Sequence, residues 1–417
     1  MEKKTAIKIC LITPGHISSN PRLVKEAIGL SDSGYQVYVI FTQYMAYQIR
    51  FDLEIIKNNP AITFESLRWN ESFSFKQYLV SGIKKMIWLV NKLSKKPDFC
   101  LPLLLNRNYY WQLKKGIKAK ADIYIGHNLG ALAISINAAK KNHASCGFDA
   151  EDFHRQETNN NHQSTLYKVV KSIEDQYLPQ LDYLTAASPL IANAYKNLYL
   201  NLQAKVINNV FPKSLLKNPQ ERRSIAGLKL FWFSQTIGKG RGLEDAIKAI
   251  GLLQNPSITL TLLGDVDEQQ TKYLVNIATE YHLLNTQLLF IKPVQSDQIF
   301  EIANQHDVGL ALERDYPLNR DICLTNKIFT YLTSGIAVIA SETSAQKAFL
   351  QQYPKIGKSY PIGNIEVLAS IIDHYANNPI FLSASKNEAY KLAEEKFNWE
   401  NEMQSFLKSI DHIGTKD

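Results

Sequence analysis

The sequence has few cysteines, and their spacing argues against two kinds of site. Cys10, Cys100, Cys146 and Cys323 lie far apart in the 417 residues, and none of them forms a CxxC pair. Disulfide frameworks and structural zinc sites both use cysteines at closer, repeated spacings. We therefore expect reduced thiols, as in a cytosolic protein, and no metal site.

Long apolar runs are also missing. No segment approaches the roughly 20 apolar residues needed to span a bilayer. The N-terminal MEKKTAIKICLITPG is too interrupted for a signal peptide, and no A-x-A cleavage site follows it. There is no low-complexity tract and no short-period repeat. The sequence therefore predicts a cytoplasmic globular protein, long enough for two domains of roughly 100–200 residues each.

Acidic residues are almost missing from residues 72–121. This window holds ten lysines and one arginine against a single acid, Asp98, so it carries +10. The whole chain carries +8, which leaves 8 − 10 = −2 for the remainder. The positive charge is therefore local and predicts a surface that meets an anionic partner. A nucleic-acid partner is not expected, because no glycine-aromatic or zinc module accompanies the basic residues.

Part of this window has a helical pattern. In FSFKQYLVSGIKKMIWLVNKLSKK the apolar residues follow steps of three and four, which define one helix face: Leu79, Ile83, Met86, Val90 and Leu93. One interpretation is a helix lying on an anionic membrane surface or beside a lipid-linked acceptor. The other is an ordinary helix packed on a sheet, with its basic side in water.

Strand and helix patterns alternate along the chain, with one interruption. Short apolar runs such as IKICLIT, VYVIFT, LKLFWFS and AVIAS have the length of buried parallel strands. The polar stretch from Lys213 to Lys229 breaks the series and predicts a linker. We expect an α/β protein with two doubly wound Rossmann-like domains, 1–212 and 226–394, that face a central cleft. The tail, about 395–417, is expected to pack back on the first domain.

The stretch FWFSQTIGKGRGLEDA joins a predicted strand to a predicted helix through three glycines and two cations. Glycines let a phosphate approach the backbone, and the free N–H groups of a helix start favour an anion. Lys239 or Arg241 would add a charge-assisted hydrogen bond. The pattern matches neither G-x-G-x-x-G nor the Walker motif, so a tight turn with solvated cations remains the alternative.

Other strand ends carry polar or glycine residues at comparable places. Gly15 and His16 follow the first strand, His127 ends ADIYIGH, and Gly264 and Asp265 end ITLTLLGD. Ligands of open parallel sheets bind beyond the carboxyl ends of strands, so these positions are candidates for a site.

Several of these segments, taken together, resemble GT-B glycosyltransferases, especially the family-4-like enzymes. The matching segments, which span nearly the whole chain, are ITPGHISSNPRLVKEAIGLSDSGYQVYVI, DIYIGHNLGAL, KVINNV, SQTIGKGRGLEDAI and LTNKIFTYLTSGIAVIAS. The resemblance implies transfer of a sugar from a nucleotide-sugar donor to the hydroxyl of a glycan or lipid-linked acceptor. It implies an acceptor-binding first domain, a donor-binding second domain, retention of configuration and no metal cofactor.

The resemblance also implies roles for individual residues. Arg241 and Lys327 would stabilise the departing diphosphate, and His127 would contact the transferred sugar. Together with the strand-end positions, it indicates a donor site made of Gly15, His16, Ser234, Gln235, Gly238, Lys239, Gly240, Gly264, Asp265, Asn326 and Thr330.

The sequence departs from the family pattern at two places. The family often carries two glutamates eight positions apart, where this chain has Ile322 and Thr330. The usual Gly-Arg of the second-domain loop is Ser234-Gln235, so Lys239 is a possible replacement for the second diphosphate cation. Two alternatives remain open: a nucleotide-sugar epimerase of the same fold and, because the glutamates are missing, a member that binds sugar nucleotides without catalysis.

The acidic stretch after GFDA offers a further candidate. Glu151 could serve as a base on the acceptor side, which would permit direct inversion at the sugar carbon. The alternative is that the acids of this stretch cap turns and helices and are otherwise solvated.

Overall fold

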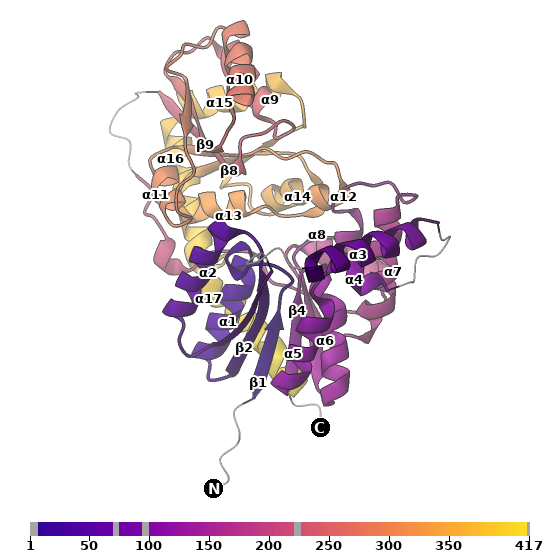
Figure 1. The fold of residues 1–417 in the computed structure, drawn as a ribbon. Coiled ribbons are helices and arrows are strands. Elements are labelled where there is room, and N and C mark those ends of the chain that lie inside the picture. Colours follow the sequence, from indigo (N-terminus) through magenta and orange to yellow (C-terminus); the bar gives the residue numbers. More distant parts are fainter. Residues whose placement is uncertain (1–6, 70–74, 94–99, 221–226, 415–417) are drawn as a thin grey trace. The chain divides into compact units, whose positions relative to one another are not determined.

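The computed structural model describes residues 7–69, 75–93, 100–220 and 227–414 of the chain. It divides into two compact units (Figure 1). The first contains residues up to Ile207 together with Met403–Asp417, and the second contains Asn208–Glu402. The first unit therefore ends at Ile207 rather than residue 212, and the returning tail begins at Met403 rather than near residue 395.

The first unit is built on a parallel sheet in the order β3-β2-β1-β4-β5-β6-β7. Its strands are β1 (Lys8–Ile12), β2 (Gln36–Gln43), β3 (Thr63–Arg68), β4 (Ile123–His127), β5 (Ser145–Ala150), β6 (Tyr183–Ala186) and β7 (Ala204–Val206). Its helices are α1 (Pro21–Asp32), α2 (Ala46–Asn58), α3 (Phe75–Leu93), α4 (Leu101–Leu105), α5 (Tyr109–Ala119), α6 (Leu129–Asn142), α7 (Thr165–Tyr177) and α8 (Pro189–Leu198).

The second unit repeats this design with the strand order β10-β9-β8-β11-β12-β13. Its strands are β8 (Leu228–Thr236), β9 (Ile258–Asp265), β10 (Leu288–Ile291), β11 (Val308–Ala311), β12 (Ala337–Ser341) and β13 (Gly357–Tyr360). Its helices are α9 (Leu243–Leu253), α10 (Glu268–Glu280), α11 (Gln298–Asn304), α12 (Leu318–Ile322), α13 (Asn326–Thr333), α14 (Ser344–Gln352), α15 (Ile365–Asn377) and α16 (Pro379–Glu395). The last helix, α17 (Trp399–Gly414), begins in the second unit and continues into the first.

Local chemistry explains the main elements. Central strands such as β1 and β12 are buried along nearly their whole length, which fits their apolar composition. Helix α1 begins as expected: the Asn20 side chain accepts from the Leu23 N–H, and Pro21 is the first helical residue. Ser188 and Pro189 open α8 in the same way. The predicted pair of doubly wound parallel sheets is confirmed.

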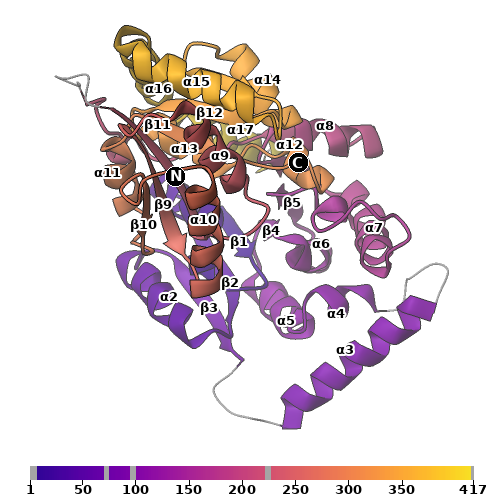
Figure 2. The same ribbon diagram turned by 90° about the horizontal axis from the view of Figure 1, so that it is seen from above.

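Helix α3 differs from the expectation that its apolar face packs on a sheet. It lies at the outer edge of the first unit, next to α4 and α7 (Figure 2). Ile87 is buried, but the predicted apolar face is 39% to 87% exposed from Ile83 to Leu93. The predicted apolar face of α3 therefore does not pack against the rest of the first unit. Part of the basic window, residues 72–74 and 94–99, lies outside the described residues. Among the residues that are described, no helix is both long and apolar enough to cross a membrane.

Candidate functional site

Each sheet has one place where the chain reverses the direction in which strands are added. It lies between β1 and β4 in the first unit and between β8 and β11 in the second. The connections leaving such a pair of strands go to opposite faces, which opens a crevice at their carboxyl ends. The loops after these four strands are therefore where a ligand site is expected.

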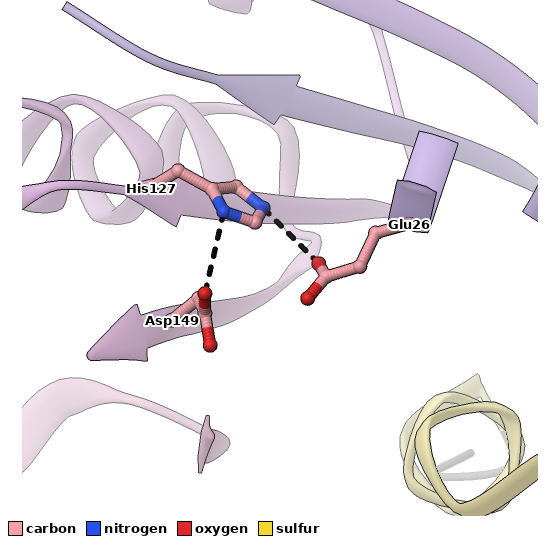
Figure 3. Close-up of side chains that lie close together, drawn as sticks. All are labelled: Glu26, His127 and Asp149. Carbon is pink, nitrogen blue, oxygen red and sulfur yellow. Dashed lines mark ion pairs between the residues drawn. The ribbon is translucent and has the colours of Figure 1, made fainter. Parts of the chain in front are cut away.

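At the end of β4, His127 lies inside a fully buried group of charged side chains (Figure 3). Its Nε2 lies 3.1 Å from Oε2 of Glu26 in α1, and its Nδ1 lies 3.5 Å from Oδ2 of Asp149 in β5. Arg22, one turn before Glu26, donates from Nε and Nη2 to the two oxygens of Asp149 at 2.5 and 2.7 Å. We call Arg22, Glu26, His127 and Asp149 the buried charge cluster.

Protonation within the buried charge cluster follows from these pairings. Burial alone favours a neutral His127, but Glu26 and then Asp149 raise the pKa of the imidazole well above its usual value. Burial likewise acts to raise the pKa of Asp149, but Arg22 and His127 hold it well below its usual range. Burial raises the pKa of Glu26 against the opposing effect of His127. The cluster thus holds cations and carboxylates together in the interior of the first unit.

Glu26, His127 and Asp149 have the residue types of a metal site, and their ligand atoms lie within 4.8 Å of one another. The guanidinium of Arg22, however, already occupies both oxygens of Asp149. A second cation at this place would be repelled by that guanidinium. The geometry instead describes an internally neutralised cluster that links α1, β4 and β5. His127 is fully buried, so none of its surface is free to contact a sugar in this structure.

His16 also uses both of its ring nitrogens internally. Its Nε2 accepts from the N–H groups of Tyr44 and Met45, at 2.8 and 2.9 Å. The proton must then lie on Nδ1, which is 2.6 Å from Asp52. The fully buried imidazole therefore ties the loop after β1 to the end of β2 and to α2.

A pocket of about 370 Å³ opens beside these loops, and we call it the cationic pocket. Its lining includes Gly15, Trp69, Lys84, Arg107 and Asn128. A Cβ added to Gly15 would meet nothing closer than 3.8 Å, so packing does not require a glycine there. Asn128, the residue before α6, has a φ of 65°, a conformation that costs on the order of 1–3 kcal/mol in a non-glycine residue.

Glu151 lies at the edge of the buried charge cluster. Its Oε1 is 3.9 Å from Nδ1 of His127, and its side chain keeps 23% of its surface exposed. It is therefore the carboxylate around His127 that reaches solvent, whereas Glu26 and Asp149 do not.

In the second unit, the glycine-rich segment forms the turn between β8 and α9. Ser234 and Gln235 belong to the end of β8, and the Ile237 N–H donates to the carbonyl of Asp265 at 2.8 Å. Asp265 itself is exposed at the end of β9. The carbonyl of Ser234 lies against Gly264, where a Cβ would come within 2.6 Å of it. The positions chosen at the ends of β8 and β9 are thus adjacent.

The backbone conformation and surroundings explain glycine at only two of the three glycine positions of the turn. Gly240 and Gly242 have φ of 70° and 75°, which disfavours other residues, and a Cβ at Gly242 would also lie 2.9 Å from Leu312. Gly238 has no positive φ, and a Cβ there would meet nothing within 4 Å. The fold does not need glycine at position 238. Close approach of a ligand to the backbone would explain why glycine is found there.

The cations near this turn differ in availability. Lys239 is exposed and lies 5.2 Å above the Tyr273 ring, and Arg241 is half-buried. Neither forms an ion pair with a carboxylate among the described residues. Arg314, after β11, instead pairs with Asp245 at 3.3 Å.

Lys327 is already paired. Its Nζ lies 2.6 Å from Oε1 of Glu313 and 5.6 Å from the centre of the Trp232 ring, and both charged side chains are largely buried. Sequence reasoning missed Glu313, although it follows β11 as His127 ends β4. The strand-end rule that selected His127 could have found it.

Ile322 and Thr330, the positions where the resembling enzymes were expected to carry glutamates, are uncharged and buried. The hydroxyl of Thr330 donates to the carbonyl of Asn326 at 2.9 Å, and Ile322 is buried. Asn326 is exposed as the first residue of α13. Of the three site residues predicted on α13, Asn326 is therefore more accessible than Lys327 and Thr330.

No family model matches the sequence, and no curated protein does. The structure is similar to that of HepE from Anabaena in complex with UDP and glucose, with a TM-score of 0.66 and 16% identity over 97% of this chain and 100% of that one. It is similar to a glycosyltransferase from Rickettsia africae (TM-score 0.68, 13% identity, 99% and 100% covered). It also resembles sucrose-phosphate synthase from Thermosynechococcus elongatus (TM-score 0.69, 14% identity, 99% and 100% covered). The chain therefore has the GT-B fold, with two Rossmann-like domains.

Proposed function

We propose that this protein is a glycosyltransferase that moves a sugar from a nucleotide-sugar donor to an acceptor hydroxyl, in the synthesis of a surface polysaccharide or glycolipid. The observation that carries the proposal is the turn after β8. There Gly238 is free of any packing requirement, and Lys239 and Arg241 lack carboxylate partners among the described residues. The GT-B similarity to a protein solved with UDP supports the same choice.

The chemistry requires stabilisation of a leaving diphosphate. Breaking the bond between sugar and phosphate builds positive charge on the ring and negative charge on the departing group. Backbone N–H groups at the start of α9, together with Arg241 and Lys239, would stabilise that negative charge. Lys327 would contribute less directly, because Glu313 already neutralises its ammonium.

The acceptor is proposed to bind the first unit, at the cationic pocket. Gly15, which the sequence assigned to the donor site, would instead leave space for the acceptor there, and the start of α6 offers backbone N–H groups. We propose retention of configuration, as the resemblance implies. Glu151 acting as a base would instead give inversion, and the anomeric coupling constant of the product, measured by NMR, distinguishes the two.

The proposal is tested first by thermal unfolding with UDP, GDP and ADP and their sugars. A ligand that binds the folded state alone raises the unfolding temperature. Product analysis with and without acceptors follows for the stabilising donor. Transfer only with an acceptor supports the proposal. Conversion of the sugar nucleotide alone indicates an epimerase, and binding without any turnover indicates a non-catalytic member.

We also propose that the cationic groups of the site replace a metal ion. Activity should then be unchanged by EDTA, and loss of activity that Mg²⁺ or Mn²⁺ restores would contradict this.

We further propose that α3 rests on an anionic membrane surface. Exposed Met86, Val90 and Leu93 form its outward apolar face, and the exposed Lys92 lies on the same helix. The protein should co-sediment with phosphatidylcholine vesicles only when they contain phosphatidylglycerol, and less so at high salt.

Changing Met86, Val90 and Leu93 to glutamine should abolish this sedimentation. Leu200→Gln is a control, because Leu200 is 84% exposed, close to the 87% of Leu93, but lies outside α3. Equal binding of neutral vesicles, or the same loss in the control, would contradict the proposal.

A further inference from the structure

The cationic pocket continues into a second hollow. An apolar groove of about 390 Å³ lies beneath α3, and its lining includes Trp88, Leu104, Leu166 and Val169. Lys84 and Leu105 line both the groove and the pocket. The two hollows are therefore one continuous surface within the first unit, polar at the strand ends and apolar under the helix.

Two cations lie where the hollows meet. Lys84 comes from α3, and Arg107 follows α4 with its guanidinium 5.7 Å from the Trp69 ring. Burial and then the nearby Arg107 lower the pKa of Lys84. Among the described residues neither cation pairs with a carboxylate. Like charges held together at the edge of a pocket are stabilised by an anion that binds between them.

Helix geometry separates this surface from the face proposed to meet the membrane. Ser81, Lys84 and Trp88 follow steps of three and four and line the groove. Met86 and Val90 lie on the exposed face. One helix thus presents a groove-lining side and an outward apolar side.

We infer that the acceptor is an amphiphile in which a phosphate links the sugar to a hydrocarbon chain. The phosphate binds Lys84 and Arg107, the sugar lies in the cationic pocket, and the start of the chain lies in the apolar groove. The inference rests on the proposed transferase function and adds the class of acceptor. A neutral glycan would leave both cations unpaired, and a free phosphate would leave the groove empty.

The probe is farnesyl diphosphate, titrated calorimetrically with UDP present at saturation so that the donor site is occupied. We expect it to bind at least about tenfold more tightly than farnesol or inorganic pyrophosphate, because each lacks one half of the contacts. Lys84→Gln with Arg107→Gln should weaken binding by about tenfold or more. Leu166→Gln should reduce the advantage of farnesyl diphosphate over pyrophosphate.

Lys114→Gln is the matched control, since Lys114 is an exposed lysine of α5 that is not among the residues lining either hollow. Thermal unfolding checks that each variant folds. Displacement of the probe by UDP, equal binding of pyrophosphate, or unchanged binding in the double variant would overturn the inference. Failure of UDP and its sugars to bind the wild-type protein would instead overturn the proposed function, so the two failures are distinguishable.

Discussion

The ends of β4 and β8 both border the place where strand addition reverses in their sheets, but they carry opposite kinds of chemistry. At β4, Arg22, Glu26, His127 and Asp149 neutralise one another and are completely buried. At β8, the turn from Gly238 to Gly242 carries two cations that no described carboxylate pairs with.

The difference separates residues that hold the fold from residues free to bind a ligand. A charge that is buried with its partner has little capacity left for a substrate, whatever its place in the sheet. A cation that remains at the surface beside open backbone can complete its interactions with an anion. Perturbing the buried site should therefore change stability, and perturbing the exposed turn should change ligand binding and turnover.

The largest effect is expected in the first unit. Arg22→Met leaves the carboxylates of Asp149 and Glu26 buried without their guanidinium, so the free energy of unfolding should fall by about 3–5 kcal/mol. Urea unfolding measures it. A loss below about 1 kcal/mol would mean that the buried charge cluster does not stabilise the fold.

Arg241→Gln should have the opposite profile. Because it removes a charge aimed at the leaving diphosphate, turnover should fall about 100- to 1,000-fold, while the free energy of unfolding stays within about 0.5 kcal/mol. Steady-state kinetics and urea unfolding of one preparation measure both. Lys248→Gln, on the half-buried side of α9, is the control. Normal turnover in Arg241→Gln would contradict the assignment.

The buried charge cluster should also make stability depend on pH. His127 has a pKa raised above its value of 6.5 in the unfolded chain, so its stabilising contribution is complete below about pH 6.5. It is lost as pH rises toward the folded pKa, by at most about 1.4 kcal/mol per pH unit. Between about pH 6 and 9, the free energy of unfolding should fall with pH more steeply in the wild type than in His127→Gln. Parallel curves would show that His127 is not charged.

The smallest effect is expected within the glycine turn. Gly238→Ala should keep its stability but bind UDP about fivefold more weakly, because a methyl group obstructs the phosphate. Gly363→Ala is not a suitable control, since its φ is 80°. Gly82→Ala is suitable, because it has open space and an ordinary φ. Unchanged UDP affinity in Gly238→Ala would weaken the assigned role of the turn.

Sequence reasoning predicted what depends on local chemistry. The buried strands, the Asn20 and Ser188 caps and the two-sheet architecture all follow from short-range patterns. It missed the edge strands β3 and β13, because half-exposed strands such as TFESLR and GKSY carry no continuous apolar run.

The pairing of side chains was beyond prediction for a different reason. Arg22 and Asp149 are 127 residues apart and meet only because the sheet places α1 beside β5. Local patterns therefore selected both His127, at a strand end, and Arg241, in the glycine turn, although distant partners bury only His127. The exposure of the apolar face of α3 could not be predicted either, because amphipathic spacing does not indicate what packs against a face.

The most direct test of the central claim is a crystal structure with UDP bound. The diphosphate should lie against the backbone N–H groups of the turn from Gly238 to Gly242, within hydrogen-bonding distance of Arg241 or Lys239. A clearly ordered UDP bound elsewhere, with this turn unchanged and in contact with no phosphate oxygen, would contradict it.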